Sequence, residues 1–331
     1  MRDASSPELN EADSSINDRK FPSSPKKLGL LPMAIITFYV VSGGPFGIED
    51  IVRAGGPFYA LIGFSLLFVW AVPEILISAE LSTALPEASG SVAWVTTAFG
   101  DFWGFQKGWL SWLSGVTDNA LYPILFLDTL LALLDNDEAI GKLARWMFIF
   151  IITAVLTLIN YRGLEVVGNT SIMICCFSML PFIIFSILGA FKVRPSRWFV
   201  GPPDGISGIN WRLFLNTFFW NINYWESAAA FSGDVLNPGV NFPRSMLLAL
   251  LLVFLLTFVP VLVGTGATST PYTAWTDGSF TRLASEIVGP WLGIWMVLSS
   301  AVSNVGMFEA EMSTDAFQVR VGYEAGVKEK L

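Results

Sequence analysis

The chain contains eight apolar segments, each long enough to cross a lipid bilayer as a helix, for which about 20 residues are needed. Only 14% of its 331 residues are charged, whereas a soluble domain of this size carries about 25%. Short connections favour one helical bundle over separate domains. The sequence therefore predicts an all-α membrane protein with spans at residues 28–52, 58–84, 103–134, 143–161, 165–191, 212–235, 245–270 and 287–312.

The segments outside this bundle are polar. Residues 1–27 lack an apolar core of the kind that a secretory signal peptide needs, and Lys20, Lys26 and Lys27 precede the first span. Positive charge before the first span is typical of a cytoplasmic N-terminus. We expect a disordered cytoplasmic tail over 1–27, a transmembrane domain over 28–318 and a polar C-terminal end over 319–331.

The first span carries a helix break. Residues 42–47 read SGGPFG, and glycine and proline are the two poorest helix formers. Within a bilayer, unwound backbone is tolerated only where protein buries it or where it lines a watery cavity. We therefore interpret residues 42–47 as a helix opened at a binding site.

The sixth span carries a second group of unusual residues. Residues 218–227 read FFWNINYWES, which places two asparagines and a glutamate inside the span. Asparagine competes for backbone hydrogen bonds and weakens a helix. Spans one and six are five apart and run in opposite directions, as expected for an inverted-repeat transporter with its site near the midplane. A kinked, polar, packed helix is the alternative for either break.

The sequence argues against enzymatic chemistry. There is no histidine, which removes the usual near-neutral proton carrier and the commonest metal ligand. No Ser/Lys or paired-Asp protease pattern occurs, and residues 43–47 lack the spacing of a dinucleotide fingerprint. Adjacent Cys175 and Cys176 are expected to be small buried side chains. We predict that the protein is not an enzyme and that it binds no cofactor, metal or nucleic acid.

Several motifs in the chain resemble plant-type polyamine and amino-acid permeases. These permeases form part of the L-type group of the amino acid–polyamine–organocation (APC) superfamily. The resemblance covers most of residues 28–318. It is carried by residues 41–50 (VSGGPFGIED), 70–74 (WAVPE), 79–81 (AEL), 102–106 (FWGFQ), 112–115 (WLSG), 118–123 (DNALYP), 125–128 (LFLD), 220–226 (WNINYWE), 237–238 (NP) and 303–312 (SNVGMFEAEM).

The resemblance implies a fold of twelve spans, ten of them in a five-plus-five inverted repeat with helices 1 and 6 broken. About eight spans are recognised here, which predicts a C-terminally truncated or short form. The resemblance also implies substrate contacts from the opened first helix and an aromatic gate at Trp220. Ordinary packing is the alternative for Trp220, whose indole could also bind an ammonium group.

Acidic residues indicate the charge of the substrate. A charge at the bilayer centre costs roughly 2.5–3.5 kcal/mol, so an acid there must face water, bind a proton or meet a cation. Glu49, Asp118 and Glu226 are the central acids and the candidates for proton coupling or cation binding. Glu309 and Glu311 lie near a span end, where solvated placement is expected.

We therefore predict proton-coupled polyamine uptake by alternating access, with a cytoplasmic N-terminus and placement in the plasma membrane. An amino-acid permease or exchanger of the same fold is the alternative, and a non-transporting short form or membrane sensor is a third. The expected partners are a small cationic substrate or amino acid, H⁺ and the lipid bilayer. The predicted substrate-binding residues are Ser42, Gly43, Gly44, Gly47, Asp118, Tyr122, Trp220, Asn221, Asn223 and Glu226.

Overall fold

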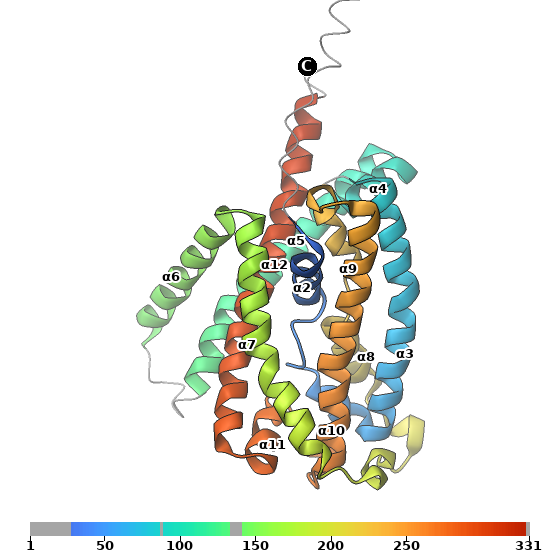
Figure 1. Cartoon of the computed structure of the whole chain (residues 1–331), viewed down its shortest axis with the longest axis vertical. Helices are drawn as coiled ribbons and strands as arrows, with labels where there is room; N and C mark the ends of the chain where they lie inside the picture. Colours follow the sequence, from blue (N-terminus) through green and yellow to red (C-terminus); the bar gives the residue numbers. More distant parts are fainter. Residues whose placement is uncertain (1–27, 87–88, 133–140, 329–331) are drawn as a thin grey trace, which may run out of the picture.

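The computed structural model describes residues 28–86, 89–132 and 141–328. This part of the chain is helical and holds no β-strand, apart from one isolated parallel bridge between Leu28 and Val235. Figure 1 shows the helices gathered into one elongated bundle, with the C-terminal helix projecting from one end. The predicted tail over 1–27 lies outside the described residues.

Five stretches of helix are long and apolar enough to cross a membrane. This confirms the prediction of an all-α chain built from membrane-spanning helices, while the other predicted spans do not form single long apolar helices in the described residues. The five stretches are α3 (Glu49–Ala84), α6 (Lys142–Tyr161), α7 (Leu164–Ala190), the continuous run Pro238–Ala267, and residues Pro290–Ala316 of α12 (Pro290–Lys328).

The run Pro238–Ala267 is made of three pieces. Helix α9 covers Pro238–Val253, a π-helical turn η4 covers Phe254–Phe258, and α10 covers Val259–Ala267. The π turn lies two residues before Pro260, which cannot donate a backbone hydrogen bond. The run therefore stays continuous while it adjusts its hydrogen-bonding pattern around the proline.

The first two predicted spans are divided differently from the expected boundaries. Helix α2 covers only Leu30–Val41, and α3 begins at Glu49 and continues past Pro57 to Ala84. The two parts of α3 join through Gly56, which has φ 70° and ψ 169°. A Cβ atom at Gly56 would lie 2.8 Å from the Gly201 Cα. Glycine is therefore required where the chain turns against this loop.

The third predicted span corresponds to α5 (Asp101–Ala132). The sixth predicted span is divided into two shorter pieces. These pieces are α8 (Trp211–Asn221) and the 3₁₀ helix η3 (Trp225–Asp234). Asn210 caps α8, because its Oδ1 accepts the Leu213 backbone N–H at 3.2 Å. The remaining connecting helices are α4 (Ser91–Phe99), η1 (Pro195–Phe199), η2 (Gly205–Gly208), η5 (Tyr272–Ala274) and α11 (Ser279–Ile287).

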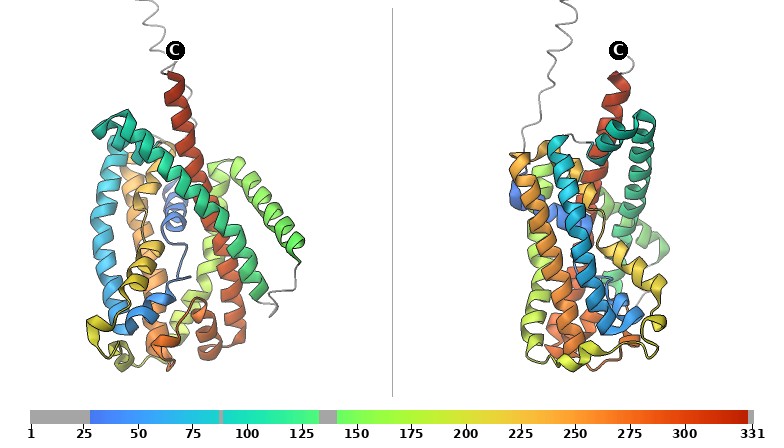
Figure 2. Two further views of the ribbon diagram at one scale, coloured as in Figure 1. Left: turned by 180° about the vertical axis from the view of Figure 1, so that it is seen from behind. Right: turned by 90° about the vertical axis from the view of Figure 1, so that its right-hand side faces the viewer.

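Helix α2 occupies the centre of the bundle, between α7, α9 and α12 (Figure 1). Its side chains Met33, Ile36 and Phe38 are fully buried. Helix α6 instead leans away from the bundle in both Figure 1 and Figure 2, and half of its residues are exposed, while Leu156 alone in this helix is buried. An exposed apolar helix of this kind suits contact with lipid, where the hydrocarbon solvates apolar side chains.

The expectation that both cysteines are buried needs correction. Cys175 is buried as predicted, but Cys176 is exposed, because adjacent residues on a helix point in different directions. Helix α12 continues past residue 318 to Lys328, and the polar C-terminal end over 319–331 stays a prediction.

Candidate functional site

The chain is not helical between α2 and α3. The backbone N–H groups of Ser42 and Gly43 both donate to the Phe38 carbonyl, at 2.9 and 3.1 Å, and end α2. Gly43 then takes φ 63°, and a Cβ atom there would collide with the Met307 side chain on α12. The freed Gly43 carbonyl accepts the Ser303 hydroxyl of α12 at 2.5 Å. The opened segment is therefore held against α12.

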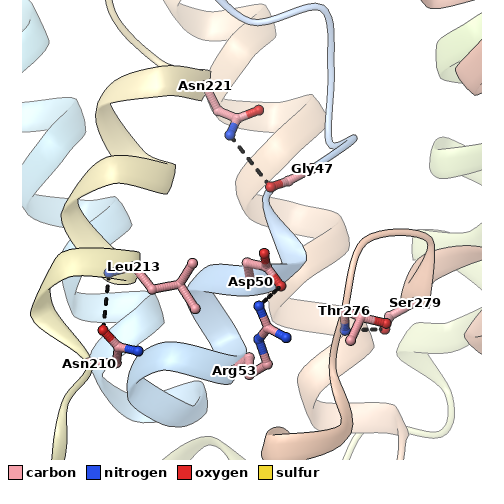
Figure 3. A network of polar contacts seen from close by, with 8 residues as sticks. All are labelled: Gly47, Asp50, Arg53, Asn210, Leu213, Asn221, Thr276 and Ser279. Atoms are coloured by element: carbon pink, nitrogen blue, oxygen red, sulfur yellow. Dashed lines mark hydrogen bonds and ion pairs between the residues drawn. The ribbon is translucent and has the colours of Figure 1, made fainter. Parts of the chain in front are cut away.

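A second non-helical stretch faces the first. Helix α8 ends at Asn221, and Tyr224 takes a left-handed conformation with φ 67° before η3 begins. The Asn221 side-chain amide donates to the Thr217 carbonyl at 2.9 Å and reaches the Gly47 carbonyl at 3.5 Å. Figure 3 shows this second contact joining the two segments. The two predicted breaks therefore lie side by side.

A cavity of about 690 Å³ opens at this junction, and α2, α5, α8, η3 and α12 contribute its walls. Its volume is in the range of small-molecule sites, about 300–1,000 Å³. Among the lining residues, Lys107 is the one Lys or Arg side chain. The lining acids are Asp50, Asp118, Glu226, Asp277, Glu311 and Asp315.

Three of these acids meet where α5 packs on α12. Glu311 and Asp315 are one helical turn apart, so they lie on the same face of α12. The Tyr122 hydroxyl donates to Glu311 Oε2 at 2.7 Å, and the Asn119 amide donates to Asp315 Oδ2 at 3.0 Å. Asp118 is close enough to interact electrostatically with both carboxyl groups. This wall of the cavity is thus strongly acidic.

The remaining wall acids lie on other elements. Lys107 Nζ is 3.5 Å from Glu226 Oε1, and this ion pair joins α5 to η3. Asp50 pairs with Arg53 within α3 at 3.0 Å, as Figure 3 shows. Asp277 lies in the connection before α11.

The pKa of the Asp277 carboxyl group is shifted from its usual value. Desolvation by the surrounding protein raises the pKa of the Asp277 carboxyl, although the residue remains partly exposed to solvent, and the neighbouring Asp50 carboxylate raises it further. The backbone N–H groups of Gly278 and Gly47 oppose this shift by donating to the carboxylate.

Most of the predicted site residues line the cavity, and three do not. Gly44 faces Met179 of α7 instead, and Asn223 is half-buried outside the lining. Glu49 is 2% exposed and accepts the Phe280 backbone N–H at 3.5 Å. The residues that the structure does bring to the cavity are Ser42, Gly43, Gly47, Asp118, Tyr122, Trp220, Asn221 and Glu226.

Glu226 already has a cationic partner, because it pairs with Lys107 across the cavity. A further expectation is wrong. Glu309 was expected to be solvated, but it is 1% exposed. The Asn160 amide of α6 donates to the Glu309 backbone carbonyl at 2.9 Å and lies 3.3 Å from its Oε2.

Sequence reasoning overlooked four acids of the cavity wall. Apart from spacing, nothing in the sequence pattern singles out Asp50, Asp277 or Asp315, and the position of Glu311 near a span end predicts solvent. One sequence signal could have identified two of them, because the spacing of Glu311 and Asp315 places both on one helical face. No set of three or more His, Cys, Asp or Glu side chains in the described ranges is arranged to hold a metal ion.

Comparisons with a family profile and with individual proteins both match permeases or transporters. The sequence profile described as amino acid permease matches residues 28–312. The chain is 48% identical over 304 residues to polyamine transporter RMV1 of Arabidopsis thaliana, covering 91% of this chain and 61% of the relative. It is 46% identical over 308 residues to polyamine transporter PUT1 of Oryza sativa subsp. japonica, covering 92% and 57%.

A probable polyamine transporter of Arabidopsis thaliana is 44% identical over 323 residues, which cover 95% of this chain and 64% of the relative. The chain therefore spans about six tenths of the length of these relatives. Its apolar helices and its relatives identify it as an integral, multi-pass membrane protein. The match over residues 28–312 places the chain in the amino acid permease family.

Proposed function

We propose that this chain binds a polyamine in the cavity between the two opened segments and takes part in proton-coupled, secondary active transport. The observation that carries this proposal is the charge of the lining, where six carboxyl side chains surround a single lysine ammonium. A polyamine carries several ammonium groups and no carboxylate, so it complements this lining. The names of the relatives, polyamine transporters, agree with this charge balance.

Three sets of groups would hold the ligand. The carboxylates of Asp118, Glu311 and Asp315 offer one end of the cavity to an ammonium group. Glu226, on η3, offers a fourth carboxylate, and Trp220 offers an indole face for a cation–π contact. The carbonyls of residues 42–47 that lack helical partners supply further acceptors.

The proposed mechanism is alternating access. The opened stretches between α2 and α3 and between α8 and η3 would correspond to broken helices 1 and 6 of an inverted repeat. Such helices can pivot at their non-helical residues, because no continuous ladder of hydrogen bonds crosses the break. We further propose a cytoplasmic N-terminus and placement in the plasma membrane, with a cavity carboxylate rather than a histidine carrying the coupling proton.

Transport is tested with the full chain in proteoliposomes. Labelled putrescine, spermidine and leucine are supplied with and without an inward proton gradient. We expect saturable accumulation of both polyamines, greater with the gradient, and little accumulation of leucine. Accumulation of leucine without either polyamine would contradict the cationic substrate and favour an amino-acid permease.

The role of the cavity is tested by Glu226→Gln and by a matched change outside it. Glu165→Gln neutralises an exposed glutamate in the first turn of α7 and should leave uptake unchanged. Glu226→Gln should reduce polyamine uptake at equal amounts of reconstituted protein. Saturable polyamine binding without accumulation in the unmodified chain would identify a non-transporting binding protein instead.

A further inference from the structure

The Lys107–Glu226 ion pair occupies a distinctive position. Lys107 lies near the start of α5, and Glu226 lies near the start of η3, 119 residues later in the chain. Both side chains line the cavity, and both are about one-third exposed, at 33% and 30%. Solvent and ligands can therefore reach the pair.

This pair also differs from the other polar contacts that α5 makes. Asn119 and Tyr122 donate to side chains of α12, and Asp128 pairs with Arg145 of α6. These contacts hold α5 to its packing neighbours. Among the described ion pairs, only Lys107–Glu226 joins two elements on different walls of the cavity.

The lysine ammonium has the same chemistry as the end of an alkyl polyamine. Each is a primary ammonium on a flexible chain of methylene groups. A ligand ammonium that approaches Glu226 must therefore compete with an equivalent group that is already attached to the protein. Because the pair is partly exposed, such competition is reversible and modest in strength.

We propose that Lys107 is a tethered competitor, a protein-bound ammonium group that competes with ligand cations for the subsite at Glu226. This inference rests on the proposed function. In the empty protein its ammonium occupies the Glu226 carboxylate, and an ammonium group of the bound polyamine displaces it. Lys107 thereby lowers the affinity for every cation that uses Glu226. It does not affect the affinity of cations that bind only at the α5–α12 carboxylates.

Two simpler roles for Lys107 make different predictions. If Lys107 only reduced the negative charge of the cavity, its removal would strengthen cation binding whether or not Glu226 is present. If Lys107 only held Glu226 in the binding position, its removal would weaken binding. A tethered competitor predicts stronger binding, and only when Glu226 is present.

The test is a double-mutant cycle on the full chain in nanodiscs, with labelled putrescine as the probe at equilibrium. Lys107→Met removes the ammonium while keeping much of the apolar stem, and Glu226→Gln removes the carboxylate. Partly exposed ion pairs contribute about 0.2–1 kcal/mol, so Lys107→Met should tighten putrescine binding by about 1.4- to 5-fold. In the Glu226→Gln background, the same change should give no tightening.

Two control variants accompany the cycle. Lys107→Arg keeps a cation that can pair with Glu226, so it should not tighten putrescine binding. Lys142→Met removes an exposed lysine at the start of α6, outside the cavity, and should have no effect. Each variant is compared after size-exclusion chromatography shows a single folded species.

The outcomes separate this inference from the proposed function. Unchanged or weaker binding in Lys107→Met overturns the tethered competitor while leaving polyamine binding in place. Equal tightening in both backgrounds also overturns it, in favour of a general charge effect. Absence of saturable putrescine binding in the unmodified chain and in Lys107→Met overturns the proposed function, and this inference with it.

Discussion

Gly43 is the residue whose substitution tests the site geometry most directly. It takes φ 63°, a conformation that favours glycine, and a Cβ atom there would collide with the Met307 side chain of α12. The left-handed conformation costs an L-residue about 1–2 kcal/mol. Overpacking costs about 1–3 kcal/mol. We therefore expect Gly43→Ala to lower the free energy of unfolding by about 2–5 kcal/mol in total.

The assay is thermal unfolding of the purified full chain in detergent, followed by tryptophan fluorescence. For a chain of this size, 1 kcal/mol corresponds to about 2 °C, so Gly43→Ala should lower Tm by about 4–10 °C. Gly239→Ala is the matched control, because a Cβ atom at that helical position meets no atom within 4 Å. It should leave Tm unchanged or raise it slightly, since alanine favours helix more than glycine.

A second substitution separates the two contributions. Met307→Ala removes the side chain that the new Cβ meets, so it should recover the overpacking part but not the backbone strain. The coupling between the two substitutions should therefore be about 1–3 kcal/mol. If Gly43→Ala leaves Tm within 1 °C of the unmodified chain, or if the two effects simply add, the assigned backbone geometry is wrong.

Three further perturbations follow from other contacts. Asn160→Leu removes the α6 amide beside buried Glu309. The free energy of unfolding should fall by about 1–3 kcal/mol in a thermal unfolding assay. An unchanged Tm would mean that this contact contributes nothing. Tyr122→Phe removes the hydroxyl that donates to Glu311. It should lower the free energy of unfolding by about 1.5–3 kcal/mol, and a Tm equal to that of the unmodified chain would refute this. The folded pKa of Asp277 is raised above 3.8, so its protonation contributes stability at low pH that is lost as pH rises through the folded pKa. Asp277→Asn should flatten the dependence of Tm on pH above 3.8, and a profile parallel to that of the unmodified chain would contradict the assignment.

Residues 42–47 and an interruption within 218–227 could be located from the sequence because the signal is local. Glycine, proline and asparagine weaken a helix wherever they occur, whatever packs around them. The structure ends α2 at Val41 and α8 at Asn221, as this reasoning predicts. The lengths of the flanking helices were less predictable, because the kink at Gly56 depends on the loop that contains Gly201.

The cavity acids show the limit of sequence reasoning. Glu309 and Glu311 are two positions apart, which rotates their side chains by about 200° around α12. The first therefore faces Asn160 of α6, and the second faces Tyr122 of α5. Hydropathy and composition treat these two residues alike, so only the packing of α12 on its neighbours could distinguish them.

The sequence predicts an all-α membrane chain interrupted near residues 42–47 and within 218–227, because apolar length and helix breaking are properties of local stretches. The packing of the helices sets which charges share the cavity. It turned Glu49 to the Phe280 backbone, brought Glu311 and Asp315 into the cavity wall, and placed Lys107 against Glu226. These relations join residues far apart in the chain, so they depend on how helices pack and which face each helix presents.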